Sequence, residues 1–159
     1  MGELIVYALF ATLLVGLTAL GSVYAVIPAR APRRWIAVAV TAWFVAVVFM
    51  TVRPGSGLGA RLNLIPVLVD GPWSAFDAFL NFFVFVPLGI LLGAIGWRVL
   101  VVLGAALAVS LSIEVAQYLT DWGRTADVND LITNVAGAAM GWLAAWAIRR
   151  AVSSGHRER

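Results

Sequence analysis

Hydrophobic residues run along this chain in long stretches, without the alternation that a helix or strand with one wet face would need. Five of the stretches approach or exceed the length of about 20 helical residues that crosses a bilayer. They span residues 4–27, 35–52, 76–95, 99–119 and 128–148. The pattern therefore predicts an all-α fold, a polytopic transmembrane helix bundle. We expect one transmembrane domain over residues 1–148 and a polar cytoplasmic tail over residues 149–159.

The segment between the second and third spans contains a shorter apolar stretch. It runs over residues 62–69, follows a glycine-rich run and is interrupted by Pro66. Eight residues are too few to cross a bilayer as a helix, and Pro66 cannot donate a backbone hydrogen bond. We expect this stretch to be interfacial or re-entrant.

The composition is that of a protein embedded in lipid, and it excludes several kinds of active site and metal site. The chain has 159 residues, of which 62% are hydrophobic and 12% are charged. Its mean hydropathy is +0.96. It has no cysteine, so disulfides, thiolate nucleophiles and cysteine metal sites are excluded. The one histidine, His156, lies in the polar tail, which argues against histidine-dependent catalysis.

Arginine supplies all of the basic charge and predicts the orientation. The arginines are scattered between apolar spans rather than gathered in a stripe, so we expect no nucleic-acid binding. Basic residues favour cytoplasmic loops, which predicts the N-terminus outside and the C-terminus inside. The inner segments then carry Arg30, Arg33, Arg34, Arg98, Arg149, Arg150, Arg157 and Arg159, against Arg53, Arg61 and Arg124 outside.

Polar residues inside the last two spans follow helical spacing and fall in the outer half. They are Ser110, Glu114, Gln117 and Asp121 near the end of the fourth span, and Asp127, Asp130 and Asn134 at the start of the fifth. Residues three, four and seven apart share one face of a helix. Because a short loop joins these spans, they are expected to be antiparallel neighbours. The two polar stripes therefore predict a pocket that opens to the outside.

Glu114 is the most costly of these residues to place within the bilayer, because a charged side chain there requires a partner, a proton or water. Arg61 and Arg124 are the nearest candidate partners on the same side. Two further amides, Asn63 and Asn81, fall at the same predicted depth. The candidate ligand-binding residues are thus Arg61, Asn63, Asn81, Glu114, Gln117, Arg124, Asp127, Asp130 and Asn134.

Each feature also has a purely structural interpretation. Asp127 and Asp130 are placed where carboxylates favour a helix N-terminus. Asn81 can hydrogen-bond to a neighbouring helix, and Glu114 can form an ion pair with an outer arginine. These interpretations leave open why the costly groups share one depth.

Small residues mark where helices can approach closely. Gly89 and Gly93 are four residues apart in the third span, as are Gly137 and Gly141 in the fifth. This spacing is typical of close packing between membrane helices. Pro87 predicts a kink.

The polar residues and glycines resemble the pattern of the VanZ-like family of bacterial membrane proteins. The resemblance covers about residues 50–145 and rests on Arg61-Leu62-Asn63-Leu64-Ile65-Pro66, Asn81, Phe85-Val86-Pro87-Leu88-Gly89, Glu114, Gln117, Arg124, Asp127, Asp130, Asn134, Gly137 and Gly141. It implies a multi-pass protein of the bacterial cytoplasmic (inner) membrane. The family takes its name from a protein linked to resistance to teicoplanin, a lipoglycopeptide antibiotic that acts outside that membrane.

Three functions fit the sequence. The favoured one is binding of an amphiphile, cell-envelope lipid headgroup or lipoglycopeptide at the outer leaflet, with membrane lipids as partners and no cofactor or metal. The second is a membrane enzyme acting on a cell-envelope lipid, with Glu114 as general acid or base and Asp127 and Asp130 holding a divalent cation. The third is a proton-coupled transporter, which at five spans would have to dimerise. Whether the chain forms a homo-oligomer stays open.

Overall fold

Helices account for nearly all of the computed structural model, which describes residues 1–27, 33–53, 61–66, 72–120 and 123–155. The two strands are only two residues long each. In chain order the elements are α1 (Gly2–Val26), α2 (Arg33–Thr51), β1 (Leu62–Asn63), α3 (Pro72–Ala94), α4 (Val99–Thr120), β2 (Ala126–Asp127) and α5 (Val128–Gly155).

The predicted fold class is confirmed, because each of the five helices is long and apolar enough to cross a membrane. Two boundaries differ from the prediction by more than two residues. α3 begins at Pro72, which suits the first turn of a helix because proline has no amide to leave unsatisfied. α5 continues to Gly155, so residues 149–155 of the predicted tail are helical. Neither proline nor glycine interrupts the chain between residues 149 and 154, and long arginine side chains can cover the helix surface.

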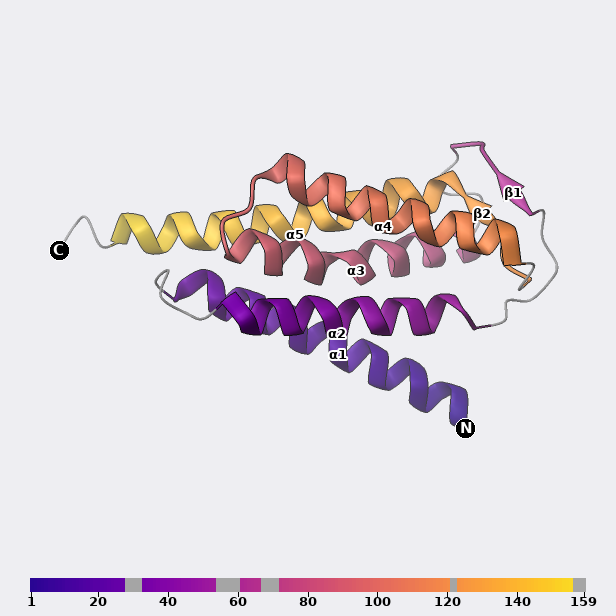
Figure 1. Cartoon of the computed structure of the whole chain (residues 1–159). Coiled ribbons are helices and arrows are strands. Elements are labelled where there is room, and N and C mark those ends of the chain that lie inside the picture. Colours follow the sequence, from indigo (N-terminus) through magenta and orange to yellow (C-terminus); the bar gives the residue numbers. More distant parts are fainter. Residues whose placement is uncertain (28–32, 54–60, 67–71, 121–122, 156–159) are drawn as a thin grey trace.

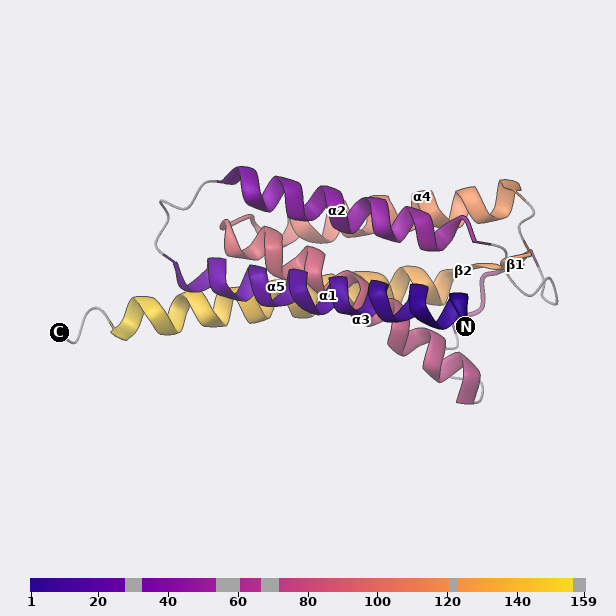
Figure 2. The same cartoon turned by 90° about the horizontal axis from the view of Figure 1, so that it is seen from below.

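The helices lie roughly along one direction, with α3 between the pair α1 and α2 and the pair α4 and α5 (Figure 1). α3 contacts each of the other helices and makes its most extensive contact with α5. Figure 2 shows the same bundle from below, with both strands at the end near the N-terminus. We call this the β end. The opposite end, where Arg33, Arg34, Arg98, Arg149 and Arg150 lie, is the arginine end.

Glycines allow α3 and α5 to pack backbone against backbone, as their spacing predicts. A Cβ atom at Gly137 or Gly141 would overlap the carbonyl of Phe82 or Val86 in α3. A Cβ atom at Gly89 would overlap the carbonyl of Ala138 in α5. Only glycine permits this approach, which brings the start of α5 close to α3.

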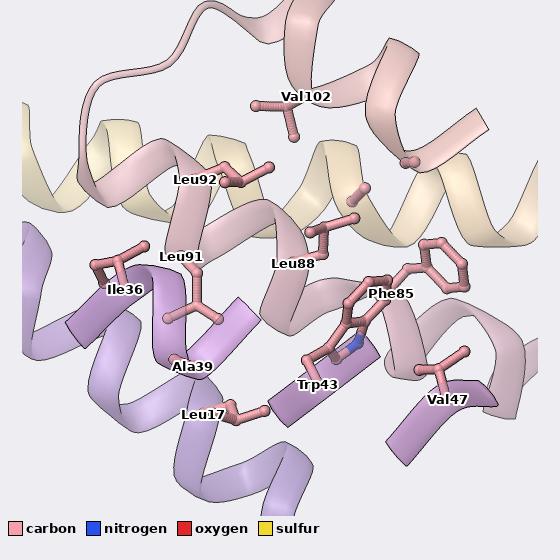
Figure 3. Packing of buried hydrophobic residues seen from close by; sticks show 12 residues of the cluster. Leu17, Ile36, Ala39, Trp43, Val47, Phe85, Leu88, Leu91, Leu92 and Val102 are labelled. Atoms are coloured by element: carbon pink, nitrogen blue, oxygen red, sulfur yellow. The ribbon is translucent and has the colours of Figure 1, made fainter. Parts of the chain in front are cut away.

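Trp43 joins α2 to the turn of α3 that precedes Pro87. Its indole is 1% exposed and meets the Phe85 ring edge to face, with centroids 5.2 Å apart (Figure 3). Pro87 lacks the amide that would bond to the carbonyl one turn earlier. The neighbouring carbonyl of Val84 accepts a hydrogen bond from Trp43 Nε1 at 2.7 Å. A side chain of α2 thereby bonds to α3 next to the position where Pro87 removes a backbone donor.

Candidate functional site

The two strands bring segments far apart in the sequence together at the β end. Leu62 and Asn63 pair in parallel with Ala126 and Asp127, and the Ala126 amide donates to the Arg61 carbonyl at 3.0 Å. Residues 62–66, expected as part of an interfacial or re-entrant segment, therefore lie against the start of α5. Residues 67–69 fall outside the described residues, and the depth of this segment in a membrane stays a prediction.

Asp127 organises this junction with its carboxylate. One oxygen, Oδ2, accepts from Asn63 Nδ2 at 3.0 Å. The other, Oδ1, accepts from the Asn129 amide at 2.8 Å and from Asn129 Nδ2 at 2.7 Å. The bond to the Asn129 amide is N-terminal capping of α5, so the structural interpretation of Asp127 is confirmed. Because both oxygens are engaged, Asp127 holds the junction together.

Glu114 joins α4 to the same junction. Its Oε2 accepts a hydrogen bond from the Asp127 amide at 2.7 Å, and the residue is only 5% exposed. Further from the β end, one turn from Glu114 in α4 and about two turns from Asp127 in α5, Asn134 Nδ2 donates to Ser110 Oγ at 2.9 Å. The polar stripes of α4 and α5 therefore face each other at two levels, as predicted. Asp121, the last residue of the α4 stripe, lies outside the described residues.

Asp130 points to a different helix from the one its spacing suggested. Its side chain is hydrogen-bonded to Asn81 of α3. Asn81 therefore joins two helices, which confirms its interpretation as an interhelical hydrogen-bonding residue. Asp77, one turn before Asn81, is an exposed carboxylate that acts on Asp130 electrostatically. The polar site is thus spread over α3, α4 and α5.

The expected ion pair between Glu114 and an outer arginine does not form among the described residues. Arg124 instead donates from Nε to the Arg53 carbonyl at 3.0 Å and from Nη2 to the Met50 carbonyl at 3.4 Å. These carbonyls lie at the end of α2, where no further helical turn can supply donors. Arg124 therefore caps α2. Arg61, immediately before β1, is exposed.

Hydrogen-bond acceptors outnumber donors in this site. Three buried amide oxygens have no partner within the described part of the chain, namely Gln117 Oε1, Asn129 Oδ1 and Asn134 Oδ1. They add to the carboxylates of Glu114 and Asp130. A buried acceptor without a donor costs free energy. The site is therefore suited to a group that donates hydrogen bonds.

An apolar groove of about 250 Å³ lies at the β end, between residues of β1, α4 and the start of α5. Its walls include Leu62, Leu64, Leu111, Val115, Tyr118 and Leu131. Glu114 and Asp127 also line it. The groove thus offers a surface for a hydrocarbon chain, and two acidic residues lie in its wall. We refer to it as the outer groove.

Two residues of the site were not singled out from the sequence. Asn129 is 8% exposed and donates from Nδ2 to the Ile65 carbonyl at 3.1 Å, which fixes the chain after β1. Thr133 donates to the Asn129 carbonyl at 2.9 Å. The spacing of Asp127 and Asn129 is that of an N-terminal cap and its bonded amide, and this pattern could have identified Asn129.

The bundle and its buried polar residues define a multi-pass membrane protein. The chain belongs to the VanZ/LLP1 family, whose model matches residues 7–149. The match includes most of α1, which had been expected to be outside the resemblance. A search of the curated proteins and a search of the solved structures found no significant match.

Proposed function

We propose that this protein binds an amphiphile at the β end, with the hydrocarbon chain in the outer groove and a donating headgroup at Glu114. The observation that carries the proposal is the outer groove itself, which is apolar and has Glu114 and Asp127 in its wall. Ligand pockets of this kind are mostly apolar, with a few polar groups that fix orientation.

The excess of acceptors indicates the chemistry of the headgroup. Arg124, three residues before Asp127, is directed to carbonyls of α2. An amine, amide or hydroxyl headgroup therefore matches the site better than a phosphate. Cell-envelope lipids with amine headgroups and acylated glycopeptides such as teicoplanin carry such donors. Binding of the latter would give resistance by holding the antibiotic away from its target.

The proposal places the β end at the outer face of the cytoplasmic membrane. The arginine count favours this orientation, because basic residues accumulate on the cytoplasmic side. The chain has no native cysteine, so Leu64→Cys and Ser154→Cys each introduce a single label site. In intact cells an impermeant maleimide should label Leu64→Cys only. Labelling of Ser154→Cys alone would show that the protein has the opposite orientation.

Binding can be tested with teicoplanin and with dioctanoyl phosphatidylethanolamine, scored by thermal stabilisation of the purified protein. Glu114→Gln keeps the shape and an acceptor for the Asp127 amide but removes the charge. We expect it to weaken binding about tenfold, as loss of one charge-assisted hydrogen bond does. Asp77→Asn is the matched control, because Asp77 is an exposed carboxylate at the same end that does not line the groove. Equal affinities for wild type and Glu114→Gln would refute the proposal.

A further inference from the structure

A second cavity, of about 360 Å³, lies at the arginine end of the bundle. Trp97 and Arg98, from the turn between α3 and α4, line one side of it. Trp146, Arg149 and Arg150 of α5 line the other side. The turn and the last part of α5 lie opposite the strands, so this cavity is separate from the outer groove (Figure 1).

Arg149 is held in a fixed position in this cavity. Its Nη1 donates to the Gly93 carbonyl in the last turn of α3 at 3.0 Å. Gly96 adopts φ +83°, and a Cβ atom there would come within 2.8 Å of Arg149 Nη1. A guanidinium has five N–H groups, so this contact leaves donors for a ligand.

The tryptophans give the cavity a rigid wall that orients Arg150. Trp142 Nε1 donates to the Trp97 carbonyl at 2.8 Å, and the Trp142 and Trp146 rings stack with centroids 6.5 Å apart. The Arg150 guanidinium lies over Trp146, 4.9 Å from its centroid. A cation held on an aromatic face keeps its edge free to form hydrogen bonds.

No acidic residue of the described chain lies near these arginines. The described carboxyl groups belong to Glu3, Asp77, Glu114, Asp127 and Asp130, all at the β end. Three guanidinium groups around one cavity repel one another, and a bound anion would relieve that repulsion.

Membrane topology alone does not require this arrangement. Arg33 and Arg34 at the start of α2 carry the same charge at the same end and do not line the cavity. Arg98, Arg149 and Arg150 differ from them because all three line the same open cavity.

We propose that this cavity binds a phosphate group, as presented by an anionic phospholipid headgroup. The planar fork of arginine matches phosphate oxygens in pairs. α4 begins directly after Arg98, and the free amides and dipole at a helix N-terminus favour an anion. Tryptophans concentrate at the membrane interface, the level at which lipid phosphates lie. Free phosphate has the same chemistry, and the experiment separates the two sources.

The test measures thermal stabilisation of the full chain, purified in a neutral detergent, by dioctanoyl phosphatidylglycerol, dioctanoyl phosphatidylcholine and inorganic phosphate. We expect phosphatidylglycerol to bind more tightly than phosphatidylcholine. Arg98→Gln and Arg150→Gln should each weaken phosphatidylglycerol binding about tenfold, the usual effect of losing a charge-assisted contact. Arg149 is left unchanged because it also caps α3.

Arg34→Gln is the matched control, since it removes one exposed arginine at the same end without touching the cavity. Unchanged affinity in this variant supports a localised site, and an equal loss in all three variants would overturn it. If millimolar inorganic phosphate competes with phosphatidylglycerol, the phosphate assignment is supported and the free anion is a second ligand of the cavity. Equal affinity for phosphatidylglycerol and phosphatidylcholine in the wild type would contradict the assignment. Unliganded melting temperatures within about a degree of each other would show that each variant is folded.

Discussion

The Glu114 carboxylate accepts a hydrogen bond from the backbone amide of Asp127 at 2.7 Å. This contact joins α4 to the first residues of α5 and places a carboxylate in the wall of the outer groove. A backbone amide cannot swing away as a long arginine side chain can. The position of Glu114 is therefore set by the fold of the junction.

The junction should depend strongly on Asn63. Asn63 donates to Asp127 Oδ2, and its Oδ1 accepts from the Ile65 amide at 3.1 Å. Asn63→Ala removes both contacts and should lower stability by about 1.5–3 kcal/mol, the range for a hydrogen bond to a charged group. Thermal unfolding of the purified protein measures this loss.

Thr120→Ala provides a control for Asn63→Ala. Thr120 is exposed, and its hydroxyl bonds only within its own helix, to the Ala116 carbonyl. We expect little change in this variant. If Asn63→Ala unfolded at the same temperature as Thr120→Ala, the strand pair would not hold the junction.

Close approach of α3 and α5 predicts a large difference between two glycines. Gly137→Ala places a methyl group on the Phe82 carbonyl, and a backbone atom cannot move aside. This variant should lower the free energy of unfolding by about 1–3 kcal/mol, the usual effect of overpacking. Gly104→Ala meets nothing within 4 Å and should be neutral or stabilise by up to about 1 kcal/mol through helix propensity. Similar melting temperatures for the two variants would be incompatible with the close packing.

Trp43→Phe tests the hydrogen bond between α2 and α3. The variant keeps an aromatic ring beside Phe85 but loses the donor to the Val84 carbonyl. Hydrogen bonds between membrane helices contribute about 0.6 kcal/mol on average and up to about 1.7, so we expect a loss in that range. Trp35→Phe, at a 54% exposed position, should change the melting temperature less. Equal changes would indicate that the indole N–H contributes nothing.

Much of the fold is predictable from the sequence because lipid imposes simple rules. A continuous apolar run must form a helix to satisfy its backbone, and this alone predicts all five spans. The spacing of Gly137 and Gly141 predicts close packing. The spacing of the polar residues predicts that the stripes of α4 and α5 face each other, as Ser110 and Asn134 do.

The finer arrangement of the site depends on contacts that spacing does not encode. Periodicity places Asp130 on a helix face but does not say which neighbour that face meets, and the neighbour is Asn81 of α3. Arg124 was expected to meet Glu114, yet the unsatisfied carbonyls at the end of α2 take its donors. The pairing of residues 62–63 with 126–127 joins segments more than 60 residues apart, and no local pattern predicts it.

Blocking the outer groove tests the proposed function most directly. Leu111 lines the groove and is 50% exposed, whereas Leu107, one helical turn away, is 46% exposed and does not line it. Leu111→Trp should fill the groove and weaken teicoplanin binding at least about tenfold, while Leu107→Trp should bind like the wild type. The same ranking is expected for dioctanoyl phosphatidylethanolamine. If Leu111→Trp bound both ligands as tightly as the wild type does, the result would contradict an amphiphile site in this groove.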